Sequence, residues 1–391
     1  MATALDVPLF RPDPYRAYAR LREKAPVYRD DECDFWALSR HADVSVAFRD
    51  AETFSSRNGN MLDPLLWGPD AAAFASISAI DPPRHTLVRG LVSRAFTRAR
   101  LARLEPRIAE IANGHLDRAL DGGEFDLVAE FTSRLPVDVI GELIGVPAAD
   151  RAEIWRLECT LVDREDETDA AAAERARSMA VLTRYFADLV VERRRNPRDD
   201  LASEVVAAAD ADGTVTESEV LALLLVLVLA GGETTSGLIA NAVDAVWRFP
   251  EARDAAYAGI DGWVEETLRF EPPFQFAGRT LTRDLTLHGV EIPEGERVLL
   301  LLASANRDGE VFDDPDRFDP TRDTSAKVTF GSGHHHCVGA QLARLEARVA
   351  LREFSRRVAD YEIDGAQAQR AGAAQFRDFT YLPIRVTPRP A

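Results

Sequence analysis

The strongest constraint on the fold is an apolar run over residues 220–232, which reads VLALLLVLVLAGG. This run is shorter than the roughly 17 apolar residues that a helix needs to cross a bilayer. It is also too apolar for a helix with one solvated face. Helical periodicity resumes in LIANAVDAVWRF and continues to residue 249. The run therefore predicts one long, deeply buried helix, with the rest of a helical body packed around it.

The remaining pattern is mostly helical. Helices are predicted over residues 13–25, 41–54, 97–120, 173–195, 251–269 and 339–357. Strand patterns are short, at 34–39 and 297–304, with a loose hairpin at 284–295. Long polar stretches, 57–72, 305–333 and 364–376, predict loops of a length that is usually functional. With no evident linker or repeat, we expect residues 1–391 to form a single domain, mainly α with a small β portion.

The composition excludes several kinds of partner. The net charge of −18 makes the chain a poor partner for nucleic acid or anionic lipid. The N-terminus has no basic start followed by an apolar core, so we expect no signal peptide. Three scattered cysteines form no disulfide framework, which suits a reducing compartment. These features predict a cytoplasmic protein that binds neither nucleic acid nor membrane.

The segment FGSGHHHCVGA, residues 330–340, concentrates three histidines and a cysteine. Structural zinc sites space their ligands in pairs, and four adjacent side chains diverge too much to reach one ion. A solvated histidine-rich loop is the alternative, but it leaves the glycines at 331, 333 and 339 unexplained. Glycines permit tight turns and close approach of the backbone to a flat ligand. Cys337 precedes an amphipathic helical pattern, whose N-terminus would favour the thiolate that an axial haem ligand requires.

This segment resembles the haem-binding signature of the cytochrome P450 superfamily. The matching positions are Phe330, Gly331, Gly333, His335, Cys337 and Gly339. The resemblance implies that Cys337 is the axial ligand of the iron of haem b. It also implies that His335 contacts a haem propionate and that Phe330 shields the thiolate from water. His334 and His336 fall on variable positions, and we expect them to be incidental.

The end of the apolar run is unusual for a buried helix. Each of its two glycines costs about 1 kcal/mol relative to alanine in a helix interior, and Glu233 follows them directly. The helix could simply end there, but the resumed periodicity favours an interruption inside one helix, which is typical of a site. Residues 230–235, AGGETT, resemble the oxygen-activation motif in the long helix over the haem of cytochromes P450. The resemblance implies that Thr234 hydrogen-bonds dioxygen and that Glu233 helps to relay protons.

Three cations are further candidates for the haem site. His85 and Arg89 are four residues apart and share one helix face, which alone would predict a helix with exposed bases. The resemblance implies instead that both contact the haem propionates, together with Arg279. Cations facing carboxylates are physically reasonable partners.

Glu266 and Arg269 are three residues apart, which alone would predict an ordinary surface salt bridge. The pair resembles the Glu-x-x-Arg element of cytochromes P450. In that element the arginine of a later segment, here Arg317, is the usual third member. The resemblance implies a structural network rather than chemistry.

Six arginines and no acidic residue lie between positions 82 and 104 of this acidic chain. They are Arg84, Arg89, Arg94, Arg98, Arg100 and Arg103. Haem carboxylates would account for part of this charge. The remainder predicts an electropositive patch suited to an acidic electron carrier, with a solvated helix face as the alternative.

The resemblance implies a soluble haem-thiolate monooxygenase that hydroxylates, or otherwise oxidises, a hydrophobic small molecule. It would use dioxygen and two electrons from a separate ferredoxin with an NAD(P)H-dependent reductase, and we expect a monomer. A peroxygenase is a second possibility, which the Glu233–Thr234 pair argues against, and a haem sensor without turnover is a third. Candidate pocket residues are Leu65, Trp67, Val226, Leu229, Ala230, Phe274, Phe276 and Phe379, although each of them taken alone is more typical of a core residue. Their apolar character suggests a terpenoid, steroid, fatty acid or macrolide substrate.

Overall fold

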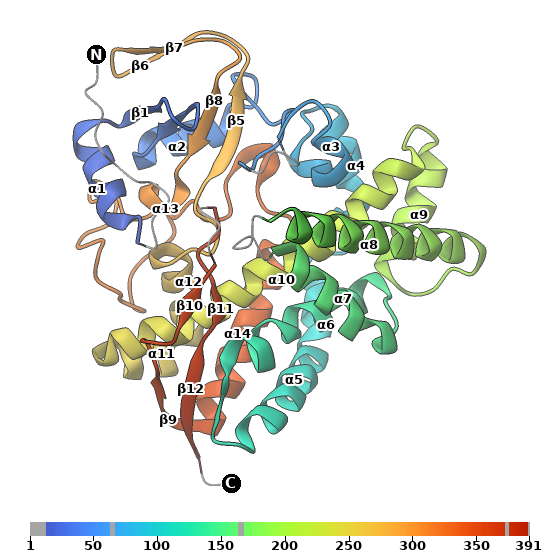
Figure 1. Ribbon diagram of the computed structural model, residues 1–391, viewed down its shortest axis with the longest axis vertical. Helices are drawn as coiled ribbons and strands as arrows, with labels where there is room; N and C mark the ends of the chain where they lie inside the picture. Colours follow the sequence, from blue (N-terminus) through green and yellow to red (C-terminus); the bar gives the residue numbers. More distant parts are fainter. Residues whose placement is uncertain (1–12, 63–66, 163–167, 372–374, 390–391) are drawn as a thin grey trace. The chain divides into compact units, whose positions relative to one another are not determined.

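The computed structural model describes residues 13–62, 67–162, 168–371 and 375–389. The chain packs into two compact units (Figure 1). Unit 1 comprises Met1–Thr86, Glu265–Cys337 and Ala373–Arg377. Unit 2 comprises Leu87–Val264, Val338–Gly372 and Asp378–Ala391. The organisation into one domain remains a prediction.

Unit 1 is built on a five-stranded sheet with the order β1-β2-β8-β5-β3. The strands are β1 (Val27–Asp30), β2 (Phe35–Leu38), β8 (Arg297–Leu300), β5 (Ala277–Leu281) and β3 (Phe54–Ser55). Only β2 and β8 are parallel; the other pairs are antiparallel. A separate hairpin joins β6 (Leu285–Leu287) to β7 (Val290–Ile292). The strands predicted at 34–39, 284–295 and 297–304 all contain strands of the structure.

Both faces of this sheet are buried. Leu299 packs with α1 (Tyr15–Lys24), while Val298 and Leu300 pack with α2 (His41–Arg49) on the opposite side. This alternation follows from the two-residue period of a strand. The other short helices of unit 1 are α3 (Ala72–Ala75), η1 (Ser76–Ser78), α13 (Leu302–Ala305) and η4 (Gly333–His335). The chain passes from one unit to the other within α4 (Arg84–Ser93) and α12 (Ile260–Phe270).

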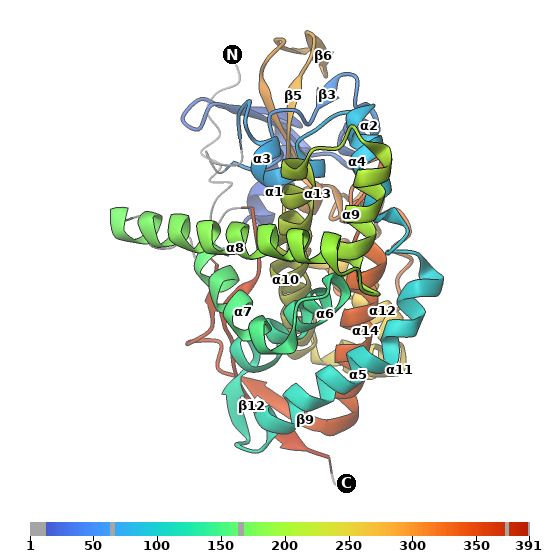
Figure 2. The same cartoon turned by 90° about the vertical axis from the view of Figure 1, so that its right-hand side faces the viewer.

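Unit 2 is a helical body around α10 (Glu217–Arg248) (Figure 1). Its other helices are α5 (Arg98–Leu120), η2 (Val128–Thr132), α6 (Arg134–Ile144), α7 (Ala148–Val162), α8 (Asp169–Arg195), α9 (Leu201–Asp212), η3 (Pro250–Ala252), α11 (Arg253–Ala258) and α14 (Ala340–Arg357). Helices α6, α8 and α14 all contact α10, and α8 crosses it (Figure 2). Neighbouring helices therefore bury most of α10, which explains its apolar sequence.

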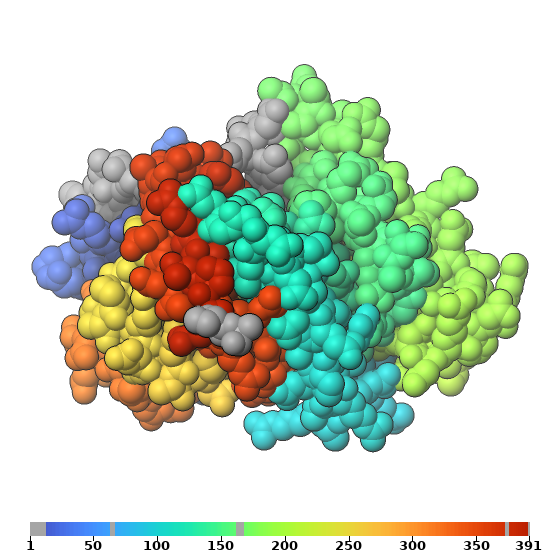
Figure 3. Space-filling view, turned by 90° about the horizontal axis from the view of Figure 1, so that it is seen from below, coloured from blue at the N-terminus to red at the C-terminus, as the bar shows by residue number. Residues whose placement is uncertain are grey.

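Two small sheets complete unit 2. The strands β4 (Glu124–Asp126), β12 (Pro383–Pro388) and β9 (Val358–Ile363) form an antiparallel sheet in that order. The red C-terminal strand β12 lies beside the teal segment around β4 in Figure 3. A two-stranded sheet pairs β10 (Gln369–Arg370) with β11 (Phe379–Tyr381). None of these strands was predicted from the sequence.

The prediction of one long buried helix is confirmed. Helix α10 begins with a capping box, in which the Glu219 amide donates to the Thr216 hydroxyl and the Glu219 carboxylate accepts from the Thr216 amide. It is long and apolar enough to cross a membrane by length and composition, but 67% of its most apolar window is buried. Core helices of soluble proteins pass the same test, so this is weak evidence for a span. The predicted mainly α fold with a small β portion is confirmed as well.

Candidate active site

In the middle of α10, one face is more accessible than the others. Ala230 is exposed, and Val226, Leu229, Glu233 and Thr234 are half-buried. These positions recur at intervals of three and four residues, so they lie on one side of the helix. The Thr234 hydroxyl donates to the Ala230 carbonyl at 2.8 Å. Unit 2 therefore presents a mostly apolar helix face that carries one carboxylate and one hydroxyl.

The two glycines of α10 have a packing role. The helix is continuous through both, so the interruption that the sequence suggested is absent. A Cβ at Gly231 would lie 3.6 Å from the Ile140 side chain of α6. A Cβ at Gly232 would lie 3.3 Å from Val137 and 2.8 Å from the Glu158 carboxylate of α7. The glycines therefore allow α6 and α7 to approach α10 closely.

The cysteine loop of unit 1 is shaped by two glycines with positive φ, +64° at Gly331 and +68° at Gly333. A Cβ on Gly333 would lie 2.8 Å from the carbonyl oxygen of Phe48, the penultimate residue of α2. The close approach is thus to α2, and not only to a flat ligand as the sequence suggested. The Cys337 amide donates to the Phe330 carbonyl at 2.9 Å, and Cys337 itself is exposed. By contrast, Gly339 has φ −82°, which any residue adopts.

Two of the predicted propionate ligands meet in unit 1. The ring centroids of His85 and His335 are 4.3 Å apart, and His85 is buried. His334, which we expected to be incidental, also lies near His85, with centroids 6.4 Å apart. The ring of His336 lies 6.5 Å from that of Phe330. The fold thus brings the imidazoles of His85 and His335 together, a contact that the pattern of the loop sequence could not have shown.

Arg279 is a buried cation on β5 in the same unit. Its guanidinium lies 5.5 Å from the centre of the Phe48 ring and donates to the Gly278 carbonyl at 2.7 Å. Burial lowers the pKa of Arg279 to about 10, and nearby Asp81 offsets this only in part. Among the described residues, no carboxylate forms an ion pair with it. Because a buried charge without a counter-ion is costly, the position is suited to an anionic ligand.

The Glu-x-x-Arg pair is fully buried in unit 1. Arg269 donates to Glu266 through two nitrogens, at 2.7 and 2.8 Å, and neither side chain is exposed. Arg269 also donates to the carbonyls of Asn306, Pro315 and Arg317. This buried pair therefore differs from the exposed surface salt bridge that the spacing alone would predict.

The third member of this network differs from the prediction. The Arg317 side chain is 62% exposed, and its nearest acid is Asp319 at 3.9 Å. Arg322 is instead the second cation on Glu266, at 3.4 Å and 12% exposed. The expectation for Arg317 is therefore corrected, because only its main-chain carbonyl takes part. No local spacing could have identified Arg322, which lies 56 residues from Glu266.

Comparison with known proteins decides the family. The family model described as Cytochrome P450 matches residues 259–357. The chain is 45% identical over 384 residues to the protein named cytochrome P450 123 of Mycobacterium tuberculosis, which covers 97% of this chain and 96% of the relative. This chain is a cytochrome P450.

Other comparisons agree with that assignment. The Vitamin D(3) 25-hydroxylase of Pseudonocardia autotrophica is 41% identical, over 88% of this chain and 85% of that protein. The structure of cytochrome P450 CYP109Q5 from Chondromyces apiculatus superposes with a TM-score of 0.88 at 37% identity. That superposition covers 100% of this chain and 98% of the other. The chain is thus a monooxygenase of the bacterial type.

Cytochromes P450 use haem b, with dioxygen as co-substrate. The residues of this P450 fit the cofactor. Cys337 supplies an exposed sulfur on a loop shaped by Gly331 and Gly333, and Arg279 is a buried cation that forms no ion pair with a described carboxylate. Carboxylates such as the haem propionates would meet that need. The fourth predicted propionate ligand, Arg89, is half-buried in α4.

Two candidate pocket residues of this P450 belong to the core instead. Phe276 is 1% exposed and packs with Tyr15 and Phe35 under the sheet of unit 1. Phe379 is buried in unit 2, with the Arg370 guanidinium 3.8 Å from the centre of its ring. Their apolar character in the sequence was a signal of core packing, so the expectation that they line a pocket is corrected.

The remaining candidates differ in their surroundings. Trp67 is half-buried, and the Arg297 guanidinium lies 4.1 Å from the centre of its ring. Phe274 is half-buried against Phe376, with ring centroids 5.5 Å apart. Leu65 lies outside the described residues. Of the three candidates on α10, Ala230 is exposed, and Val226 and Leu229 are half-buried like Trp67 and Phe274.

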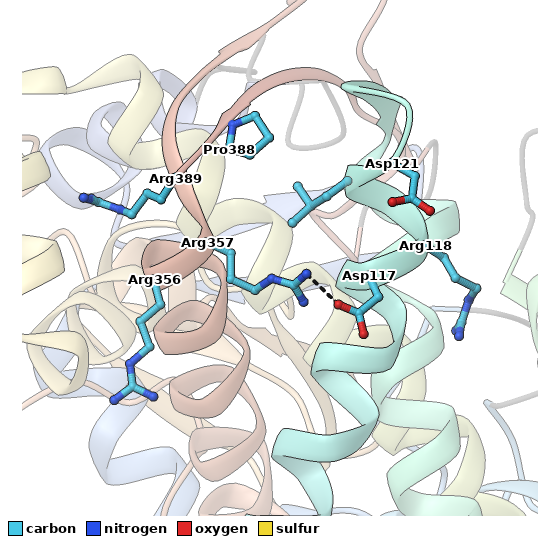
Figure 4. A pocket seen from close by; sticks show the side chains of 8 residues that line it. Asp117, Arg118, Asp121, Arg356, Arg357, Pro388 and Arg389 are labelled. Atoms are coloured by element: carbon cyan, nitrogen blue, oxygen red, sulfur yellow. Dashed lines mark hydrogen bonds and ion pairs between the residues drawn. The ribbon is translucent and has the colours of Figure 1, made fainter. Parts of the chain in front are cut away.

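A surface pocket of about 670 Å³ lies elsewhere on unit 2, at the ends of α5, α14 and β12 (Figure 4). Arg357 pairs there with Asp117 at 2.6 Å, while Arg118, Arg356 and Arg389 point away from one another. Arginines in the last turn of a helix interact favourably with its dipole. Arg118, Arg356 and Arg357 thus stabilise the ends of α5 and α14, and the pocket contains none of the predicted site residues.

Proposed function

We propose that this cytochrome P450 hydroxylates a hydrophobic small molecule, using dioxygen and two electrons from a ferredoxin with an NAD(P)H-dependent reductase. The observation that carries the proposal is the face of α10, where apolar Val226, Leu229 and Ala230 adjoin Glu233 and Thr234. An apolar surface binds an apolar substrate, and an acid beside a hydroxyl suits proton delivery. We further propose a cytoplasmic monomer that binds neither nucleic acid nor membrane.

When bound, haem b supplies the electron storage and the dioxygen activation that no side chain can provide. Cys337 would hold its iron through the thiolate, and Phe330 would keep water from the sulfur. The propionates would be held by Arg279 together with His85, His335 and Arg89. The 4.3 Å separation of the His85 and His335 rings supports a shared carboxylate partner.

The acid and the hydroxyl of α10 have separate tasks. The Thr234 hydroxyl donates a hydrogen bond to the Ala230 carbonyl. Its oxygen can also accept a hydrogen bond and so orient a donor on the face of α10 that carries Ala230 and Glu233. Glu233 precedes it in the chain, and its half-buried carboxyl can exchange protons with water and pass them on. Reduction of dioxygen with insertion of one oxygen atom consumes two protons, so delivery at this point controls how efficiently electrons become product.

The substrate class follows from the apolar lining. A terpenoid, steroid, fatty acid or macrolide would bury its hydrocarbon surface against α10. The name of the relative that hydroxylates vitamin D3 supports the same size and polarity. Vitamin D3, testosterone, palmitic acid and erythromycin therefore form a first panel of test compounds.

The electron donor is inferred from the arginine patch. Arg94, Arg98 and Arg103 are exposed, whereas Arg100 pairs with Glu204 of α9. Three of the six arginines lie in the first turns of α5, where the helix dipole disfavours cations and no acid is present. Because they do not stabilise that helix end, an acidic protein partner such as a ferredoxin is a better explanation than a solvated face.

Spectroscopy and turnover test the proposal together. The purified haem protein should show the red-shifted Soret band of a thiolate-ligated, carbon monoxide-bound P450 and a type I shift with at least one panel compound. With ferredoxin, reductase and NADPH, that compound should raise electron consumption and yield a hydroxylated product. Product formed only with added peroxide would indicate a peroxygenase. A spectral shift with no electron consumption would indicate a sensor.

A further inference from the structure

Glu158 of α7 is a buried acid that the proposed chemistry does not yet use. Its side chain is 6% exposed, and its Oε1 has no hydrogen-bond partner among the described residues. Its Oε2 lies 2.8 Å from the position that a Cβ on Gly232 would occupy. The carboxyl therefore fills the space that the missing side chain of Gly232 leaves on α10.

The surroundings of Glu158 disfavour its charged form. Burial raises its pKa well above the ordinary value, and no cation offsets that effect. Arg134, the cation close to this turn of α7, stacks on Trp155 at 4.3 Å and donates to the Ala129 carbonyl at 2.7 Å. The raised pKa favours the protonated acid, which can donate a hydrogen bond and release a proton.

The contact of Glu158 with α10 connects it to the acid and hydroxyl of the active site. Gly232 directly precedes Glu233, and successive residues lie about 100° apart around a helix. Burial raises the pKa of Cys159, the residue after Glu158, to about 11, and the charges of Glu158 and Glu233 add to that effect. Two carboxyls with different environments, one buried and one half-buried, are a common arrangement for an acid and its relay partner.

We propose that Glu158 is a second acid of the proton-delivery system, which returns a proton to Glu233 after Glu233 has released its own toward Thr234. This inference rests on the monooxygenase function proposed above. The proton leaves the Glu158 carboxyl, crosses by way of a water molecule and binds the Glu233 carboxylate. Solvent then restores the proton to Glu158, because a buried carboxylate without a counter-ion is costly. No electrons move in this step, and each proton consumed at Thr234 is replaced by one from solvent.

The variant Glu158→Gln tests the proposal, since a carboxamide keeps the size of the side chain and its hydrogen-bond donor but cannot release a proton. The infrared spectrum of the resting protein at pH 7 should contain the carbonyl stretch of a protonated carboxylic acid, and Glu158→Gln should lose that band. Haem content and the spectrum of the reduced carbon monoxide complex should be unchanged. The assay uses the panel compound that gives the largest type I shift. The yield of product per electron pair should fall roughly tenfold, and hydrogen peroxide should replace the lost product. This decrease is smaller than the one expected when a directly acting acid is removed. The solvent deuterium isotope effect on product formation should rise.

Glu346 of α14 provides a matched control. It is 2% exposed, burial raises its pKa, and its Oε2 has no hydrogen-bond partner among the described residues. Glu346→Gln should remove its own infrared band and leave the yield of product per electron pair unchanged. Equal loss of product in the two variants would show a general effect of removing a buried acid and would overturn the proposal.

Gly232→Ala is a second variant in case Glu158→Gln folds poorly. Its Cβ would displace the Glu158 carboxyl without removing the acid, so the infrared band should shift in frequency and product per electron pair should fall. The proposal is overturned if Glu158→Gln retains wild-type product yield and isotope effect, or if the wild-type spectrum has no acid band that this variant removes. Failure of the monooxygenase function would look different, because the wild-type protein itself would then form no product.

Discussion

Arg322→Ala should lower the free energy of unfolding by about 2 to 3 kcal/mol, whereas Arg317→Ala should change it by less than about 0.5 kcal/mol. The Arg322 guanidinium is 12% exposed and lies 3.4 Å from buried Glu266. It also donates to the carbonyls of Asp313, of Asp314 at 3.0 Å and of Arg317 at 3.2 Å. Each such bond contributes about 1 kcal/mol net, and water replaces those at the surface in part.

The small effect expected for Arg317→Ala has a structural cause. Its side chain is 62% exposed, and its nearest acid, Asp319, lies 3.9 Å away, a pair that contributes at most about 1 kcal/mol and often nothing. The Arg317 carbonyl accepts hydrogen bonds from both Arg269 and Arg322. Alanine keeps that carbonyl, so the network survives the substitution.

Urea unfolding of the haem-loaded proteins, followed by circular dichroism, measures both effects. With a slope of about 3 kcal/mol per molar urea, Arg322→Ala should lower the midpoint by about 0.7 to 1 M. The midpoint of Arg317→Ala should stay close to that of the wild type. A midpoint for Arg317→Ala as low as that of Arg322→Ala would refute the reasoning and restore Arg317 as the third member of the network.

Three further predictions concern the function. Cys337→Ser should abolish the red-shifted Soret band of the reduced carbon monoxide complex, and Cys33→Ser should leave it intact; control of that band by Cys33 would contradict the assignment. Thr234→Ala should keep haem binding but divert electrons from product to hydrogen peroxide, measured as product and peroxide per NADPH, because it removes the hydroxyl on the open face of α10. The hydroxyl of Thr235 belongs to a side chain that is 3% exposed, so stronger uncoupling in Thr235→Ala would reverse the assignment. Arg98→Glu should slow reduction by an acidic ferredoxin in stopped-flow experiments, chiefly at low ionic strength; equal rates across a salt series would make the patch an ordinary solvated face.

Features that depend on neighbours in the chain were predictable from the sequence. The apolar run gave the position of α10, because a helix packed on all sides needs apolar residues at every phase of its period. The family motif predicted Cys337 together with Gly331 and Gly333, whose positive φ angles require that residue type. The predicted helix over residues 251–269 was nearly right, but Gly259 separates α11 from α12.

Features that depend on distant contacts were not predictable. The strands β9 and β12 pair although 19 residues lie between Ile363 and Pro383, and short strands of this kind carry little pattern of their own. Phe276 and Phe379 could not be told from pocket residues, because an apolar side chain looks the same in the sequence whether it faces a substrate or the core. Arg322 joined the buried network only through the fold of a long loop.

The glycine pair of α10 shows why one local signal can support two different structures. A glycine inside a helix costs about 1 kcal/mol relative to alanine, so its presence implies a compensating gain. An interruption at a site and a close approach of neighbouring helices both provide one, and the sequence does not distinguish them. The structure does, because α10 is continuous while Ile140 and Glu158 occupy the space beside Gly231 and Gly232. The packing that explains Gly232 also brings a buried acid to the residue before Glu233, so the packing role and a role in proton delivery are compatible at the same position.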